Sequence, residues 1–246
     1  MIGTIGLLGP EARERVARLA TAIERAREPG RDGVAPAAGV PLADRPIDHA
    51  CLAAAVRRVA AVLADAGALS ADEVAAIEGH ADLEGDLAAV LAWATGRPAS
   101  PPFEDAAIVW SVLRLALPPF VAPCLPTPRE TADRGCPECG MSPDLAILQA
   151  SGARILVCGA CDMEWRADRV RCPFCGNASQ DLLGYLAGGG AGLVIRVCDA
   201  CRTYLKTIDR RVVGGDESPL LLRMLLAEMD LAAAGAGYGP APGSLR

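Results

Sequence analysis

The chain has 246 residues, of which 52% are hydrophobic, 22% charged and 4% aromatic, so it is long enough for one large domain or two modest ones. This composition excludes a disordered or collagen-like chain, and the net charge of −6 argues against a general nucleic-acid binder. No apolar run approaches the ~18 residues of a membrane span. The apolar start from Met1 to Pro10 lacks the basic residues of a signal peptide. We therefore expect a cytoplasmic protein without stable membrane association.

The first half of the chain predicts helices. Apolar residues recur at helical spacing in four segments, which are Glu11 to Glu28, Pro46 to Ala66, Leu83 to Thr95 and Phe103 to Leu117. Ser70 and Glu73 have the spacing of a capping box, which starts a further short helix. Pro118 and Pro119 end the last of these helices, and a Pro-rich stretch follows. We interpret residues 1–133 as an all-helical domain with a linker at its end.

From residue 134 the pattern changes to short strands between turns. Alternating apolar residues predict two hairpins, one at Leu145, Ile147, Ile155 and Val157, the other at Leu183, Tyr185, Leu193, Ile195 and Val197. Each hairpin lies between two cysteine pairs, which predicts two small modules over residues 134–170 and 171–213. Residues 214–246 predict one helix, from Leu220 to Ala234, and a loose tail. The fold class we expect is α+β, with an N-terminal helical domain, two tandem rubredoxin-like or zinc-ribbon modules and a C-terminal helix.

Eight of the ten cysteines form four C-x2-C pairs, which are Cys136 and Cys139, Cys158 and Cys161, Cys172 and Cys175, and Cys198 and Cys201. Each pair places two thiolates at two corners of a tetrahedron, so two pairs complete a four-sulfur metal site. The spacings of 18, 10 and 22 residues between pairs favour two sites in sequence and leave interleaved pairing open. Disulfides are rare in the reducing cytosol, and a thioredoxin-like motif needs a βαβ setting. We interpret Cys51 and Cys124 as ordinary buried thiols.

Tetrahedral sulfur ligation suits zinc or iron, and the spacing does not separate the two metals. The first and third pairs enclose a proline and precede a glycine, a form that rubredoxins and zinc ribbons use, whereas the second and fourth pairs lack both residues. A closed four-sulfur site has no open coordination position, which weighs against hydrolytic metal catalysis.

The sequence contains no recognisable catalytic motif. His49 and His80 are the only histidines, and neither belongs to a triad or zincin pattern. We therefore expect no enzyme. Two alternatives stay open, a zinc-ribbon module of a nucleic-acid or transcription complex, and a thiol oxidoreductase with one metal-free C-x2-C pair. We interpret a basic strip of Arg166, Arg169 and Arg171 as solvated loop charge, with a docking surface for an acidic partner as the alternative.

The cysteine region resembles the FdhE family of formate dehydrogenase accessory proteins. The matching stretches are Cys136 to Pro143, Gly152 to Trp165 (with Arg154 and Glu164), Arg171 to Cys175 and Arg196 to Lys206. The acidic pair Asp216 and Glu217 before a leucine-rich helix, and Gly237 with Tyr238, also fit. The likeness is weaker before residue 134. The chain departs from the family in its shorter N-terminal part and at Arg166, where a histidine often follows the tryptophan.

This resemblance implies a fold, a cofactor and a partner. The fold is a helical N-terminal domain followed by tandem rubredoxin-like modules, in which the eight paired cysteines bind iron; zinc is the other metal that fits. The implied function is that of a cytoplasmic assembly factor, which binds the catalytic subunit of respiratory formate dehydrogenase before export by the twin-arginine route and supports its activation. No nucleic-acid partner is implied.

Overall fold

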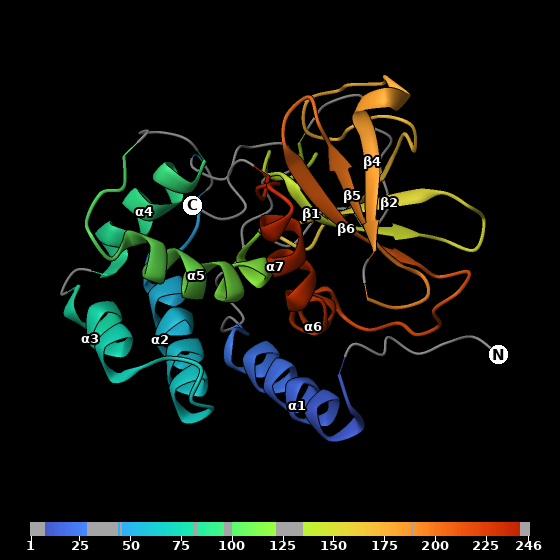
Figure 1. Ribbon diagram of the computed structural model, residues 1–246. Coiled ribbons are helices and arrows are strands. Elements are labelled where there is room, and N and C mark those ends of the chain that lie inside the picture. Colours follow the sequence, from blue (N-terminus) through green and yellow to red (C-terminus); the bar gives the residue numbers. More distant parts are fainter. Residues whose placement is uncertain are drawn as a thin grey trace.

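The structure, a computed structural model, describes residues 8–28, 44, 46–80, 83–95, 100–121, 135–187 and 189–241. These residues form seven α-helices and one six-stranded sheet, which confirms the expected α+β class. The helices are α1 (Pro10–Ala26), α2 (His49–Asp65), α3 (Ala71–Gly79), α4 (Leu83–Ala94), α5 (Ala106–Ala116), α6 (Pro219–Leu225) and α7 (Ala227–Gly235). None of the described helices combines the length and the apolar character that a membrane span requires. In Figure 1, α2 to α5 form a group on one side, the sheet lies on the other, and α6 and α7 lie between them.

The predicted helices of the first half are present, and local chemistry sets their ends. At the start of α3, the N–H of Glu73 donates to Oγ of Ser70 at 3.2 Å, and the N–H of Ser70 donates to Oε2 of Glu73 at 2.7 Å. This reciprocal capping box satisfies two backbone donors that a helix start leaves free. Helix α5 ends before Pro118, because proline lacks the N–H that a continuing helix needs. The start of the expected linker differs from the prediction, since Pro118–Phe120 form a short, packed 3-10 helix.

The sheet joins the two cysteine-rich segments edge to edge. Its strands are β1 (Pro143–Leu148), β2 (Arg154–Cys158), β3 (Glu164–Ala167), β4 (Leu183–Ala187), β5 (Leu193–Cys198) and β6 (Thr203–Asp209), in the order β3-β2-β1-β6-β5-β4. Both predicted hairpins are confirmed, with Leu145 opposite Val157 and Leu186 opposite Ile195. Strands β3 and β6 are additional strands that the predicted hairpins did not include. Because β6 pairs in parallel with β1, the two tandem units share one continuous sheet.

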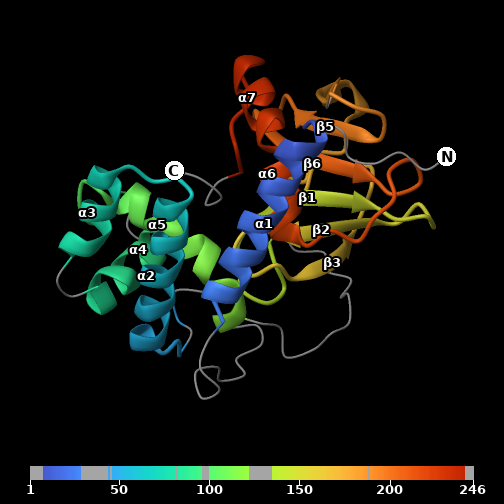
Figure 2. The same cartoon turned by 90° about the horizontal axis from the view of Figure 1, so that it is seen from below.

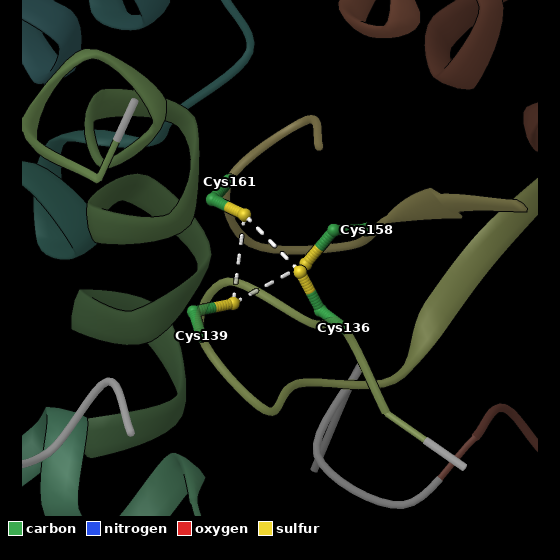
Figure 3. A group of neighbouring side chains, drawn as sticks. All are labelled: Cys136, Cys139, Cys158 and Cys161. Atoms are coloured by element: carbon green, nitrogen blue, oxygen red, sulfur yellow. Dashed lines mark hydrogen bonds between the residues drawn. The ribbon is translucent and has the colours of Figure 1, made fainter. Parts of the chain in front are cut away.

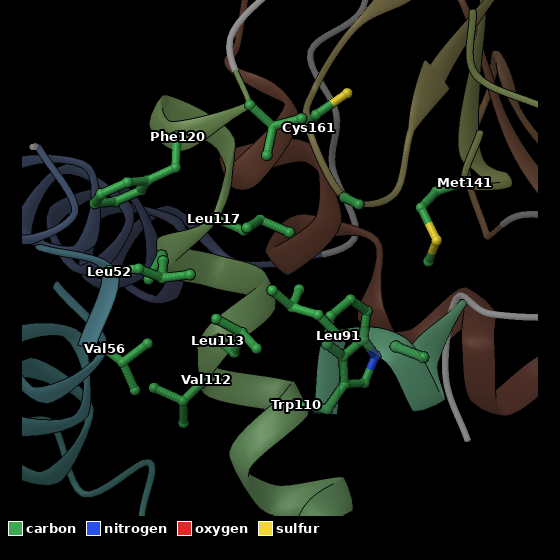
Figure 4. Packing of buried hydrophobic residues seen from close by; sticks show 14 of the residues in the cluster. Leu52, Val56, Leu91, Trp110, Val112, Leu113, Leu117, Phe120, Met141 and Cys161 are labelled. Atoms are coloured by element: carbon green, nitrogen blue, oxygen red, sulfur yellow. The ribbon is translucent and has the colours of Figure 1, made fainter. Parts of the chain in front are cut away.

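One apolar core runs from the helices into the first cysteine segment. Figure 4 shows α2, α4 and α5 contributing Leu52, Leu91 and Trp110, among others, beside Met141 and Cys161 of the cysteine region. The same cluster includes Trp165 of β3. A second core forms between α6, α7 and the face of the sheet that carries Leu145, Ile195 and Ile208. The helical part is therefore packed directly onto the first cysteine segment.

The C-terminal segment differs from its prediction in two ways. The expected single helix is two helices, because Leu226 (φ −106°, ψ 17°) leaves helical geometry between α6 and α7. The tail is not loose as far as residue 241. The N–H of Tyr204 donates to the carbonyl of Gly239 at 3.2 Å, and the N–H of Gly239 donates to the carbonyl of Arg202 at 2.8 Å. These hydrogen bonds hold the tail against the start of β6.

The first helix of the chain packs against the C-terminal helix α6 (Figure 2). Oγ of Ser218 donates to Oε1 of Glu24 at 2.6 Å, and Arg13 pairs with Glu217 at 2.7 Å. These contacts join residues that are far apart in the sequence, and they hold α1 against the C-terminal segment.

Candidate metal centres

All four C-x2-C pairs share one backbone geometry. The residue after the second cysteine has a positive φ in each pair, at Gly140 (+78°), Asp162 (+59°), Gly176 (+76°) and Arg202 (+55°). In the first three pairs the N–H of the first cysteine also donates to the carbonyl five residues on, at 2.8 or 2.9 Å. Glycine takes this left-handed conformation without steric cost, whereas other residues lose roughly 1–2 kcal/mol. The pairs without a trailing glycine therefore fold into the same turn at a cost.

Contacts from the C-terminal segment hold the two non-glycine residues in this conformation. The carboxylate of Asp162 accepts a hydrogen bond from Nη1 of Arg223 at 2.6 Å. The guanidinium of Arg202 donates to Asp199 at 2.7 Å and to the carbonyl of Gly237 at 3.1 Å, and it stacks on the ring of Tyr238 at 4.2 Å. These contacts offset the backbone strain.

The first and second pairs bring four sulfur atoms together at the end of the β1–β2 hairpin (Figure 3). The Sγ atoms of Cys139 and Cys158 lie 3.5 Å apart, as do those of Cys139 and Cys161, and the Cys136 and Cys161 sulfurs lie 3.6 Å apart. Backbone N–H groups point at two of the sulfurs, from Glu138 to Cys136 at 3.4 Å and from Ala160 to Cys158 at 3.3 Å. Such N–H groups stabilise thiolate ligands.

The third and fourth pairs form an equivalent group at the end of the β4–β5 hairpin. The sulfurs of Cys172 and Cys201 lie 3.7 Å apart, and so do those of Cys175 and Cys198. Side chains that the sequence analysis did not single out also contact this group: Nδ2 of Asn177 lies 3.9 Å from the Cys198 sulfur, and Oγ1 of Thr203 lies 2.8 Å from the Cys201 sulfur. Thr203 lies two residues after Cys201, and Asn177 two residues after Cys175, so the positions next to each pair could have identified both side chains.

The spacing of the sulfurs fits a tetrahedral metal. Metal–sulfur bonds of about 2.3 Å in a tetrahedron place sulfur atoms about 3.8 Å apart, close to the observed 3.5–3.7 Å. A disulfide needs about 2.05 Å. The grouping is sequential, because the first pair joins the second and the third joins the fourth. Both groups could therefore hold a metal ion. That the eight cysteines bind a metal stays a prediction, and zinc and iron both fit this donor set.

The two groups differ in exposure. All four cysteines of the first group are buried, whereas Cys175 and Cys201 of the second are partly exposed. Four thiols packed this closely compete for ionisation. Hydrogen bonds, chiefly from Cys139, lower the pKa of Cys136, whereas burial raises the pKa of Cys158. Burial also raises the pKa of Cys172 to about 12. A bound cation supplies the positive charge that lets all four sulfurs ionise together.

The other residues that the sequence analysis singled out have varied surroundings. Trp165 and Arg154 are buried, whereas Arg166, Arg169 and Arg171 of the basic strip are exposed. Cys51 is only partly buried, against the helical core, and Cys124 lies outside the described residues. His80 pairs with Asp86 at 2.7 Å and stacks on Phe103.

Comparison with known proteins gives likenesses in sequence and in fold. No family model matches the chain. It is 30% identical over 115 residues to an FdhE homologue of Stutzerimonas stutzeri, which is 45% of this chain and 37% of that protein. It is 33% identical over 102 residues to an FdhE homologue of Pectobacterium carotovorum, covering 38% of this chain and 33% of that protein. The crystal structure of the FdhE protein from Pseudomonas aeruginosa matches 95% of this chain and 93% of its own, with a TM-score of 0.66 and 21% identity.

The likeness to curated FdhE proteins in sequence is confined to less than half of this chain, whereas the likeness in fold is nearly complete. The aligned stretches span about a third of the length of the curated FdhE relatives, while the FdhE crystal structure shares the fold over nearly the whole chain. An FdhE-like fold therefore carries the two four-cysteine groups described above.

Proposed function

We propose that this chain is a cytoplasmic accessory protein of respiratory formate dehydrogenase and is not itself an enzyme. The proposal rests on one combination: sequence likeness to curated FdhE proteins together with two complete four-cysteine groups. Closed four-sulfur sites leave no position for a substrate on the metal. This argues for a role in binding and maturation.

The eight paired cysteines are the proposed ligands, and iron is the proposed metal. Iron held by four thiolates accepts and returns one electron without a change of ligands. The protein contributes the surroundings. The packed core keeps water from the first group, and the N–H groups of Glu138 and Ala160 stabilise negative charge on sulfur.

The proposed partner is the catalytic subunit of formate dehydrogenase, bound before its export. We place the contact at the second cysteine group, because Cys175 and Cys201 reach the surface. Two large side chains near the third pair in sequence or on β4 are also exposed, Val170 by 54% and Tyr185 by 63%. We propose that the partner also packs against these two side chains.

Metal content and visible spectrum of protein purified without oxygen test the cofactor. We expect two irons per chain, with a thiolate-to-iron absorption band that appears on oxidation. Two zincs in protein from the native source would contradict the iron assignment and favour structural ribbons.

Formate dehydrogenase activity in a strain that carries only a variant of this protein tests the function. Cys172→Ser with Cys175→Ser should impair maturation and reduce co-purification with the catalytic subunit. The matched control is Cys51→Ser, which changes a cysteine outside both groups. Normal enzyme activity with the double variant would refute the proposed role of the second group.

A further inference from the structure

A pocket lies on the sheet at the seam between the two cysteine-rich units. Strand β2 of the first unit and strands β5 and β6 of the second line it, and the third C-x2-C turn covers it. Its volume is about 300 Å³, part of it open to solvent. Its lining includes three arginines, Arg154, Arg171 and Arg196, two cysteines of the second group, and apolar side chains such as Phe174 and Leu205. The two cysteines are Cys172 and Cys198.

Arg154 is the unusual member of this lining. Its side chain is 2% exposed, and Nη2 donates to the carbonyl of Arg171 at 3.1 Å. Nε is buried and has no hydrogen-bond acceptor in the part of the chain that the structure describes. A buried guanidinium costs several kcal/mol unless a negative group is paired with it. The lining therefore contains a buried guanidinium with an unmet demand for a hydrogen-bond acceptor, although the charges of Asp168 and Cys172 favour its ionised form.

The neighbouring arginines add to this demand. Nη2 of Arg196 donates to the carbonyl of Arg169 at 2.9 Å, and its guanidinium lies 5.1 Å from the ring centre of Tyr185. Among the described residues, neither of these contacts pairs the charge of Arg196 with a carboxylate. Arg171 pairs with Asp168 at 3.4 Å, where both side chains are more than half exposed. Such an exposed pair contributes little and is easily exchanged.

We propose that this pocket binds an oxyanion, a single carboxylate or phosphate group, through Arg154, Arg171 and Arg196. Forked guanidinium groups recognise these planar or tetrahedral anions with charge-assisted hydrogen bonds. The volume of about 300 Å³ includes open solvent and the enclosed part is small, so the pocket takes one anionic group and leaves a short apolar body at its mouth. The body packs on Phe174, Leu183 and Leu205. The source of the group is either a free anion or an acidic side chain of a protein segment.

Calorimetric titration of the full-length, metal-loaded protein tests this site. The probes are inorganic phosphate and a short peptide with a central aspartate flanked by leucines. We expect one saturable site per chain at millimolar or tighter affinity. Arg196→Gln and Arg171→Gln should each weaken binding by about tenfold, which is the loss of one charge-assisted contact. Arg18→Gln is the matched control, because Arg18 is exposed on α1 and does not line the pocket.

The two probes distinguish the sources. Phosphate binding alone assigns the site to a free anion, and peptide binding alone assigns it to a protein segment; competition between the two supports the shared site. Arg154→Lys, which keeps the charge but loses the fork, should weaken binding and leave the thermal unfolding midpoint within a few degrees of the parent. The proposal is overturned if neither probe binds at one site, or if Arg196→Gln and Arg171→Gln bind as tightly as Arg18→Gln. Either result would leave the cysteine group itself as the counter-charge of Arg154.

Discussion

Replacement of Arg223 by methionine should destabilise the protein strongly. Arg223 of α6 makes four hydrogen bonds to the first cysteine unit: two to Asp144 at 2.7 and 3.0 Å, one to Asp162 at 2.6 Å and one to the carbonyl of Cys158 at 2.7 Å. The side chains of Arg223, Asp144 and Asp162 are 10%, 12% and 17% exposed. Methionine keeps most of the volume but removes the charge and every donor.

The expected loss in the free energy of unfolding depends on the ionic partners that Asp144 and Asp162 keep. Removing one partner of a buried ion pair costs about 3–5 kcal/mol, because a buried charge is left behind. Here Asp144 keeps Arg114 at 3.8 Å, and Asp162 keeps Arg27 at 3.5 Å. These longer contacts place the expected loss near the lower limit, about 3 kcal/mol. Burial by itself raises the pKa of Asp144, but Arg223 and Arg114 outweigh it, so the pKa stays below its ordinary value of 3.8. A depressed carboxyl pKa stabilises above the ordinary value, so the loss should be constant between about pH 5 and 8 and shrink only in stronger acid.

Urea unfolding followed by tryptophan fluorescence measures this loss, because Trp93, Trp110 and Trp165 all lie in the shared core. Arg211→Met is the matched control, since Arg211 pairs with Asp209 at an exposed site, and it should cost less than about 1 kcal/mol. A loss for Arg223→Met no larger than that of Arg211→Met would refute the reasoning.

Three further outcomes follow from the geometry. A chelator should release metal from the second cysteine group first, because Cys175 and Cys201 are partly exposed. Alkylation followed by mass spectrometry should find these two cysteines labelled before those of the first group. Simultaneous labelling of both groups would contradict this prediction. Gly140→Ala should cost about 1 kcal/mol in urea unfolding, since φ is +78° there. The control is Gly79→Ala, at the end of α3 with open space around it, which should be neutral or stabilising. An equal loss of stability in the two variants would count against the positive φ of Gly140 as the cause. Asp230→Asn should cost about 2 kcal/mol, because it removes the ionic partner of buried Lys206 at 2.8 Å, and a neutral result would be inconsistent with that pair.

The sequence predicts features that depend on near neighbours. Helix α3 begins at its capping box because Ser70 and Glu73 are three residues apart and satisfy each other's backbone. The hairpins follow from apolar alternation on either side of a short turn. The eight cysteines in four pairs similarly predict two four-sulfur groups. Each of these signals is contained in a few adjacent residues.

Other features of the same region have no such local signal. Apolar alternation in β1 does not specify β6 as its parallel neighbour. The positive φ of Asp162 and Arg202 is unexpected for these residue types, and it depends on contacts with Arg223 and Tyr238 from much later in the chain. The prediction of a loose tail was wrong as far as residue 241 for the same reason, since its hydrogen-bond partners Arg202 and Tyr204 lie at the start of β6.

By itself, the sequence determined the helical first half, the two hairpins and the cysteines available for metal binding, because helix caps, periodicity and C-x2-C spacing act over a few residues. The spacing of the cysteine pairs favoured sequential grouping, and the tertiary structure shows that grouping. Tertiary structure alone decided that the first group is buried in the helical core and that Arg154 lines a pocket beside Arg196. The reason is physical. Burial and charge pairing depend on which distant segments share a surface, and that choice is made by the packing of the whole chain.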